Sequence, residues 1–393
     1  MFPSEKASSF NTVPLLVIAL TIVITELPVF SGPPEIIWER NLLTEFNSRF
    51  WGVNCTDDGG AICVGELASE DEEITSLLLA KYTSQGLLQW KTVTGLSLGS
   101  AGYDVLQVPG GYIVCGSIFS GTNYDGLLAK FDYFGNIVWR SHLENPNDDV
   151  LYDVVMVGDS CYAATGYTKS TGAGQKDAWL VLYDFNGNLL WSRAFGTSGS
   201  EIAYSVTTLR DGGFALVGGC EGNFYIVITD ENGIGRSART YDNGGHEIAR
   251  ALIESIEGGF FLVGSTMENN SYQSDIWLVR TNSSGEETWT LEIEGSNIDT
   301  AWDVVEPETG GFIILGNTMS SGSGKYDAVL YRIDPWQNVI WEIHAGDSLW
   351  NTGSGLSINS EGNLFFAGKT ESAESGLFSS WLVHTSPEDL LNW

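Results

Sequence analysis

Acidic, amide and hydroxyl side chains recur along the chain at nearly constant spacing, and their oxygens could bind a ligand. One series consists of Ser48, Ser100, Asp149, Glu201, Glu247, Asp299 and Asn351. Its members are separated by 52, 49, 52, 46, 52 and 52 residues. A circle of such oxygens could hold Ca²⁺ or a sugar. Alternatively, each side chain bonds its own loop, and its presence in every copy favours this structural role.

Aromatic residues stand beside the acidic series. Trp302 and Trp350 neighbour Asp299, Asp303 and Asn351. Flat rings next to carboxylates suit sugar or peptide ligands, whereas packing between sheets is the alternative use of the same rings. The predicted ligand-binding residues are Asp149, Glu201, Glu247, Asp299, Trp302, Asp303, Trp350 and Asn351.

Two further polar series follow the same spacing. Asp104, Asp153, Ser205 and Asp303 start an inner strand in their copies, and Ala251 interrupts them. We expect this series to line the mouth of a central channel. The other series is Asp125, Asp177, Asn223, Asp275 and Asp327. Asp and Asn at strand starts normally accept hydrogen bonds from loop amides, so we predict that role for it.

Catalytic motifs are weak. Residues 95–99 read G-x-S-x-G, but they lie between strands, without the helix that follows a nucleophile elbow. The histidines show no spacing typical of a metal site. We therefore predict no catalytic residues and no resident cofactor, with Ca²⁺ as the one candidate ion. The alternative is an enzyme that uses Glu201, Glu247 and Asp299 as paired carboxylates.

Tryptophan marks the repeat that must position these side chains. The marking residues are Trp38, Trp90, Trp139, Trp191, Trp289, Trp341 and Trp393. Their gaps are 52, 49, 52, 98, 52 and 52 residues, and Ser237 stands at the missing place inside the double gap. Each interval holds four short apolar runs joined by turn residues, as in YDVLQV followed by Gly110 and Gly111. A period near 50 with this pattern is typical of propeller blades.

We predict an all-β, seven-bladed β-propeller over residues 33–393, built from four-stranded antiparallel blades. The repeats end near residues 90, 139, 191, 237, 289, 341 and 393. The marking tryptophans would pack between neighbouring blades. Residues 34–43 copy a fourth strand, so we expect them to complete the last blade and close the ring, which removes a free sheet edge. In the alternative, residues 389–393 close that blade and residues 36–38 add at its outer edge.

The turn before several tryptophans resembles a known motif. D-x-x-G-x-x-x-W, as in Asp132, Gly135 and Trp139, resembles the tryptophan-docking motif of quinoprotein-like propellers. The wider repeat is similar to secreted prokaryotic seven-bladed β-propeller repeat proteins, over almost all of the chain after Gly32. The departures from the motif are Thr83, Ser237 and Gln337. The resemblance implies a fold and no fixed chemistry, because one propeller fold hosts many activities.

Charge and the N-terminus indicate where the protein acts. With 18 basic and 50 acidic residues the net charge is −32, a field that repels nucleic acid and anionic lipid. Residues 7–25 carry no charge, and residues 13–25 are apolar. We predict that residues 1–31 are a secretory signal peptide or an N-terminal membrane anchor, and that the protein is secreted or on the cell surface. In an exported chain Cys55 and Cys63 could form a disulfide across a hairpin, or remain buried thiols.

These observations predict a non-catalytic extracellular binding or scaffold module that is monomeric. Its ligand would be a glycan, a peptide or a partner protein. The binding surface would be the linker face, where each outermost strand passes to the next innermost strand. Two alternatives remain: a propeller enzyme with acids at the channel mouth, and a calcium-stabilised structural surface protein.

Overall fold

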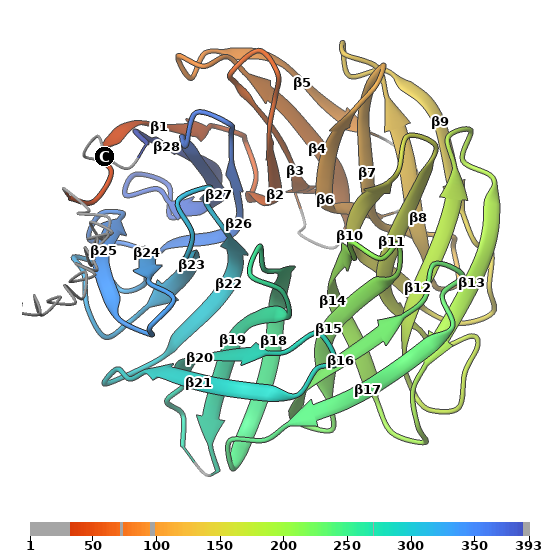
Figure 1. The fold of residues 1–393 in the computed structure, drawn as a ribbon. Coiled ribbons are helices and arrows are strands. Elements are labelled where there is room, and N and C mark those ends of the chain that lie inside the picture. Colours follow the sequence, from red (N-terminus) through yellow and green to blue (C-terminus); the bar gives the residue numbers. More distant parts are fainter. Residues whose placement is uncertain (1–31, 71–73, 95–98, 270, 388–393) are drawn as a thin grey trace, which may run out of the picture.

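The computed structural model describes residues 32–70, 74–94, 99–269 and 271–387. All the regular elements among them are β-strands, and these form seven four-stranded antiparallel sheets. The sheets stand radially around a central axis, as Figure 1 shows. The predicted all-β seven-bladed propeller is therefore confirmed.

The first six blades run outward from the central channel in sequence order, and the last blade takes its outermost strand from the N-terminal end. The innermost strands are β2 (Ser48–Cys55), β6 (Ser100–Val108), β10 (Asp149–Val157), β14 (Glu201–Thr208), β18 (Gly245–Glu254), β22 (Asp299–Val305) and β26 (Asn351–Ile358). The second strands are β3 (Ala61–Ala68), β7 (Gly111–Phe119), β11 (Cys161–Thr168), β15 (Phe214–Cys220), β19 (Phe260–Glu268), β23 (Phe312–Thr318) and β27 (Leu364–Glu371). The third strands are β4 (Thr75–Tyr82), β8 (Tyr124–Phe131), β12 (Asp177–Asp184), β16 (Asn223–Thr229), β20 (Asp275–Thr281), β24 (Asp327–Ile333) and β28 (Phe378–Thr385). The outermost strands are β5 (Leu88–Thr94), β9 (Ile137–His142), β13 (Leu189–Phe195), β17 (Gly235–Tyr241), β21 (Glu287–Ile293), β25 (Val339–Ala345) and β1 (Ile36–Leu42).

The N-terminal strand closes the propeller, as predicted. The last blade has the strand order β26-β27-β28-β1, so its outermost strand comes from the other end of the chain. β1 runs antiparallel to β28, with Trp38 opposite His384 and Leu42 opposite Ser380. Figure 1 shows the two strands side by side. Pairing covers the edge of β28, which would otherwise expose unpaired backbone groups.

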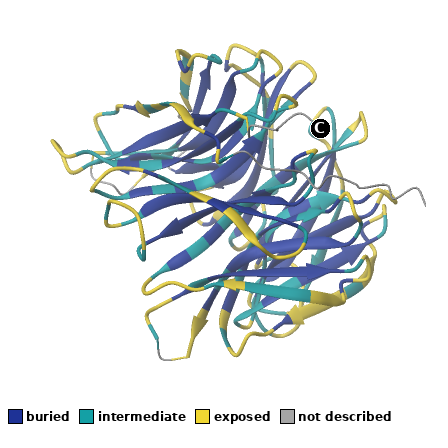
Figure 2. Ribbon diagram, turned by 60° about the vertical axis from the view of Figure 1, so that its left-hand side comes forward, coloured by how far each residue is buried: buried dark blue, intermediate teal, exposed yellow. Residues whose placement is uncertain are grey.

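The apolar core lies between the blades. Where the first two blades meet, Val64 and Leu79 of one sheet pack in a cluster with Val114 and Leu127 of the next. Comparable clusters fill the other blade interfaces. The second and third strands are consequently buried on both faces and read as continuous apolar runs. Figure 2 shows buried strands inside and exposed loops at the periphery.

Tryptophans of the outermost strands reach into the following blade. The indole Nε1 of Trp139 donates to the carbonyl of Phe185 at 3.1 Å, and that of Trp90 donates to the carbonyl of Tyr133 at 3.0 Å. Trp38 makes the same contact across the closure, to the carbonyl of Ser84 at 3.1 Å. Each acceptor lies in the turn before the outermost strand of the next blade. The tryptophan thus joins consecutive blades by a hydrogen bond as well as by packing.

Gly187 lies under the indole of Trp139, so a substitution at Gly187 tests this contact. It has a φ of +81°, and a Cβ at this position would lie 2.6 to 2.9 Å from three ring carbons of Trp139. We expect Gly187→Ala to destabilise the protein by about 2–4 kcal/mol, from the strained φ plus displacement of the ring. Gly110 is a matched control, because it has a φ of +85° and a methyl group added there would have nothing within 4 Å. Gly110→Ala should cost only about 1 kcal/mol, measured by urea unfolding. Equal losses for the two variants would contradict the docking role.

Some predictions fall outside the described residues. These are the signal or anchor in residues 1–31, the closing role of residues 389–393, the packing of Trp393, and most of the 95–99 motif. The described residues contain no helix that is long and apolar enough to cross a membrane. All five cysteines are free, so the structure does not contain a Cys55–Cys63 disulfide.

Candidate functional site

Each innermost strand carries a β-bulge at the same place. The strand registers shift there, which leaves one residue of the innermost strand without a direct partner. A bulge re-aims the side chain of the extra residue. The extra residues are Trp51, Tyr103, Tyr152, Tyr204, Arg250, Trp302 and Ser354. All seven line one central cavity of about 660 Å³, and we call them the collar.

A glycine in the second strand permits each bulge. Gly116 pairs with Gly102 immediately before the bulge of β6. A Cβ on Gly116 would collide with the carbonyl oxygen of Ala101, so no other residue fits. The equivalent glycines are Gly65, Gly166, Gly218, Gly264, Gly316 and Gly368. The glycine that recurs at the end of the second apolar run in the sequence therefore serves the collar.

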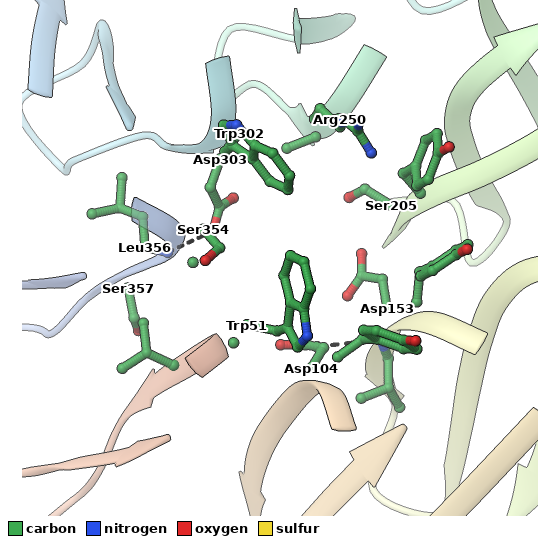
Figure 3. A pocket seen from close by; sticks show the side chains of 18 of the residues that line it. Trp51, Asp104, Asp153, Ser205, Arg250, Trp302, Asp303, Ser354, Leu356 and Ser357 are labelled. Atoms are coloured by element: carbon green, nitrogen blue, oxygen red, sulfur yellow. Dashed lines mark hydrogen bonds between the residues drawn. The ribbon is translucent and has the colours of Figure 1, made fainter. Parts of the chain in front are cut away.

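Collar side chains touch one another around the cavity. Tyr152 lies between Tyr103 and Tyr204, with ring centroids 5.2 and 5.1 Å away. The guanidinium of Arg250 lies 4.5 Å from the ring centre of Tyr204 and 4.7 Å from that of Trp302. Two further contacts close the circuit: Trp302 stacks on Trp51 at 6.2 Å, and Trp51 meets Tyr103 edge-on at 5.9 Å. Figure 3 shows Trp51, Arg250 and Trp302 around a common open space.

Three carboxyl groups follow the collar by one residue and line the same cavity. They are Asp104, Asp153 and Asp303. Each accepts a hydrogen bond from a backbone N–H of the next blade: Val154 at 3.3 Å, Val206 at 2.7 Å and Leu356 at 2.7 Å, respectively. These bonds tie neighbouring blades together at the channel wall. Figure 3 shows the carboxyl groups of Asp153 and Asp303 directed towards the open space.

Burial disfavours the charged form of these carboxyl groups. It raises the pKa of Asp303 from an ordinary 3.8 to about 7. Asp104 and Asp153 hydrogen-bond to each other, and burial together with the adjoining Asp153 carboxylate raises the pKa of Asp104 well above its usual range. Burial raises the pKa of Asp153 as well. The hydrogen bond between the two carboxyl groups raises the pKa of Asp104 and lowers that of Asp153, so Asp104 is the partner that keeps its proton more tightly.

The predicted linker acids do not reach this cavity. They lie in the first residues of the innermost strands instead of in the linkers, and their side chains are buried in their own blade ends. Asp149 accepts from Asn145 Nδ2 at 2.6 Å, and Glu201 accepts from Thr197 Oγ1 at 2.6 Å. The same local bonding holds for Glu247, Asp299 and Asn351. These bonds fit a loop-stabilising role. Glu201 Oε2, Glu247 Oε2 and Asp299 Oδ1 are nevertheless buried without a hydrogen-bond partner among the described residues, and a ligand role for the five side chains stays a prediction from the sequence.

The two tryptophans predicted beside the acids have different surroundings. Trp302 belongs to the collar, and Asp303 lies directly below it in the cavity wall. Trp350 does not line the cavity and stacks on Tyr326 with ring centroids 5.4 Å apart. The two occupy different positions of the repeat: Trp302 is the extra residue in the bulge of β22, whereas Trp350 precedes β26.

The third polar series behaves as predicted where its bonds are described. Asp177 accepts from the backbone N–H groups of Ala173 and Gly174 at 3.0 and 3.1 Å. Asp327 accepts from the N–H groups of Ser323 and Gly324 at 2.6 and 2.9 Å. Among the described residues, no three His, Cys, Asp or Glu side chains gather in a way that could hold a metal ion. A calcium role for the acids stays a prediction from the sequence.

The collar itself contains residues that the sequence analysis missed. Tyr103, Tyr152, Tyr204 and Arg250 share the spacing of the acid series a few positions later, but their types vary between copies. No single-residue motif therefore marks them. The sequence signal that could have found them is the recurrent glycine of the second strand. It pairs with the residue immediately before the bulge, and the bulge contains the collar residue.

No family model matches the sequence, and no curated protein matches it. The fold is similar to solved structures. The structure of YCF48 bound to D1 peptide matches with a TM-score of 0.55 and 10% identity, over 94% of this chain and 100% of that one. The Pan2 WD40 domain of Neurospora crassa matches with 0.54 and 9%, over 86% and 90%. Puromycin hydrolase matches with 0.52 and 12% over 84% of this chain, which spans only 53% of that chain. At such identities the likeness shows a β-propeller and nothing about its ligand.

Proposed function

We propose that the protein is a non-catalytic binding module that acts outside the cell or on its surface and takes a segment of a peptide or partner protein into the central cavity. The collar carries this proposal. Seven positions from seven blades converge on one cavity, and five of them are Trp or Tyr. A volume of about 660 Å³ is typical of sites that enclose a ligand or a few side chains of a peptide.

Two further observations support a polar polymer as ligand. The indole Nε1 of Trp51 is buried and has no hydrogen-bond partner among the described residues, so a turn of this ring towards the cavity would offer a donor to a ligand carbonyl or hydroxyl. Trp and Tyr also provide rigid faces that lose little side-chain entropy on binding. The apolar segment near the N-terminus supports the extracellular location.

Trp302 and Trp350 offer a matched pair for testing the site. We expect Trp302→Ala to weaken ligand capture by at least about tenfold, because it removes one wall of the collar. Trp350→Ala should bind as wild type does, because that ring lies outside the cavity. The protein and both variants would be screened against a displayed peptide library and a glycan array. Equal loss in both variants, or no capture by wild type, would contradict the proposal. Capture of glycans alone would keep the site and change the ligand class.

A second candidate function is hydrolysis by a pair of carboxyl groups. The hydrogen-bonded Asp104 and Asp153 favour it, since a proton-sharing pair in a cavity can supply an acid and a base. The binding role accounts better for the hydrogen bonds that these carboxyl groups accept from backbone N–H groups. Asp303 accepts the same kind of hydrogen bond without a second carboxyl group beside it. Turnover of a captured peptide or glycan that disappears in Asp104→Asn would favour the enzyme.

A further inference from the structure

We infer that the group held in the cavity is a cation, the side chain of a Lys or Arg residue of the bound peptide, which enters the collar above Asp153 and Asp303. This inference rests on the proposed binding function and names the chemistry of its ligand. It follows from the π faces of the collar, from the carboxyl groups beneath them and from the charge of the whole protein.

The collar already holds one guanidinium group. Arg250 is sandwiched between the faces of Tyr204 and Trp302, at 4.5 and 4.7 Å from the ring centres. Aromatic faces attract cations because their quadrupole is negative there. The remaining collar rings, Trp51, Tyr103 and Tyr152, line the same cavity and have no cation from the described residues over them except Arg49 on Trp51. They can accept a ligand cation in the way that Arg250 is accepted.

The acids of the cavity form no ion pair with the described residues, although Arg250 lines the same cavity. No ion pair in the described part of the chain involves Asp104, Asp153 or Asp303. Their raised pKa values follow from that situation, because burial without an opposite charge disfavours ionisation. A cation placed between them would favour ionisation again. The structure thus contains a charge arrangement that is completed by a positive ligand.

Arg250 lines the cavity and could instead favour an anionic ligand, such as a peptide carboxylate. Its charge, however, faces two aromatic rings, and three carboxyl groups line the cavity with it. The long-range field points the same way. A protein with a net charge of −32 attracts cationic segments and slows the approach of anionic ones. A cation is therefore the favoured occupant.

The test uses four capped tripeptides, acetyl-Gly-Xaa-Gly-amide with Lys, Arg, norleucine or Glu at the centre. Binding to the full chain would be followed by the indole N–H resonances of Trp51 and Trp302. We expect the Lys or Arg peptide to bind at least about tenfold more tightly than the norleucine peptide, with no saturable shift from the Glu peptide. Asp303→Asn and Asp153→Asn should each reduce this preference several-fold. Trp350→Ala should leave it unchanged, as the control away from the cavity.

The pH dependence provides a second readout. Affinity for the Lys peptide should rise between pH 5.5 and 8, as Asp303 loses its proton, while affinity for the norleucine peptide stays constant. The other charged groups that face Asp303 across the cavity are Asp104, Asp153 and Arg250. Burial raises the pKa of Tyr103 and Tyr152, so these phenols stay neutral in this range.

The possible outcomes distinguish a failure of this inference from a failure of the proposed binding function. If the norleucine or Glu peptide binds as tightly as the Lys and Arg peptides, or more tightly, the inference of a cationic ligand is wrong. The binding function still holds in that case if library peptides bind and their binding requires Trp302. Failure of all four tripeptides, with library peptides that bind and lack Lys and Arg, also overturns the cation. Failure of both the tripeptides and the library overturns the binding function together with the inference.

Discussion

A chain that begins at Leu43, and so lacks β1, is expected to lose the closed propeller and to melt at least about 7 °C below the chain that begins at Gly32. β1 supplies the outermost strand of the last blade and pairs with β28 from Ile36 to Leu42. It also joins the first blade, because Arg40 Nε donates to the carbonyl of Gly86 at 2.9 Å. Loss of a strand ladder at about 1 kcal/mol per hydrogen bond, plus the burial of Trp38, amounts to roughly 5 kcal/mol or more. In a domain of this size that corresponds to a shift of about 7 °C or more.

The truncation has an internal control in the missing strand itself. A synthetic peptide of residues 33–43 added to the shortened chain should restore part of the melting temperature, since the edge of β28 remains available for pairing. The melting temperature would be followed by circular dichroism at several peptide concentrations. If the chain from Leu43 melts like the chain from Gly32, another segment closes the last blade, and residues 389–393 become the candidate.

The second large effect concerns Asp303 and is a gain of stability. We expect Asp303→Asn to raise the free energy of unfolding at pH 8 by about 2–3 kcal/mol. The difference between a pKa of 3.8 and one of about 7 corresponds to on the order of 4 kcal/mol against the ionised carboxylate in the folded state. Asparagine avoids this term but loses about 1 kcal/mol, because Asp303 accepts from the N–H groups of both Val304 and Leu356, and an amide has one oxygen.

The sign of this effect should depend on pH. The folded state binds the Asp303 proton more tightly than the unfolded state, so the contribution of Asp303 to stability is full below about pH 4 and is lost as the pH rises through 7. At pH 4 the variant should therefore be no more stable than wild type. Urea unfolding at both pH values measures the crossover. Asp132→Asn is the control, because hydrogen bonds from Asn136 lower the pKa of that exposed carboxyl group, and no stabilisation is expected there. If the variant is less stable than wild type at pH 8, the hydrogen bonds that Asp303 accepts from backbone N–H groups contribute more to stability than the buried charge costs.

Local sequence patterns determined the number of blades, the four strands in each and the strand that closes the last blade. Alternating or continuous apolar runs set each strand, and glycine turns set each hairpin. Both act between residues that are close in the chain. The closing strand could be predicted because residues 34–43 copy an outermost strand but have no blade of their own to complete.

The site depended on details that these patterns do not contain. The series from Ser48 to Asn351 was assigned from the sequence to the linker face. The innermost strands begin a few residues earlier than the apolar runs suggest, so the acids of this series lie within those strands and are buried. Trp302 and Trp350 looked equivalent as aromatic neighbours of acids. A bulge of one residue places Trp302 in the channel, while Trp350 stacks on Tyr326.

The sequence by itself determined the repeat, because a blade is built from contacts within about 50 residues and each copy carries the same strand and turn signals. The tertiary structure alone decided which side chains meet. Tyr103, Tyr152 and Trp302 come from different blades and share no motif, yet they line one cavity because radial packing brings the same strand position of every blade to the axis. The carboxyl groups that follow them, Asp104, Asp153 and Asp303, acquire raised pKa values for the same reason, since burial and mutual proximity exist only once the ring is closed.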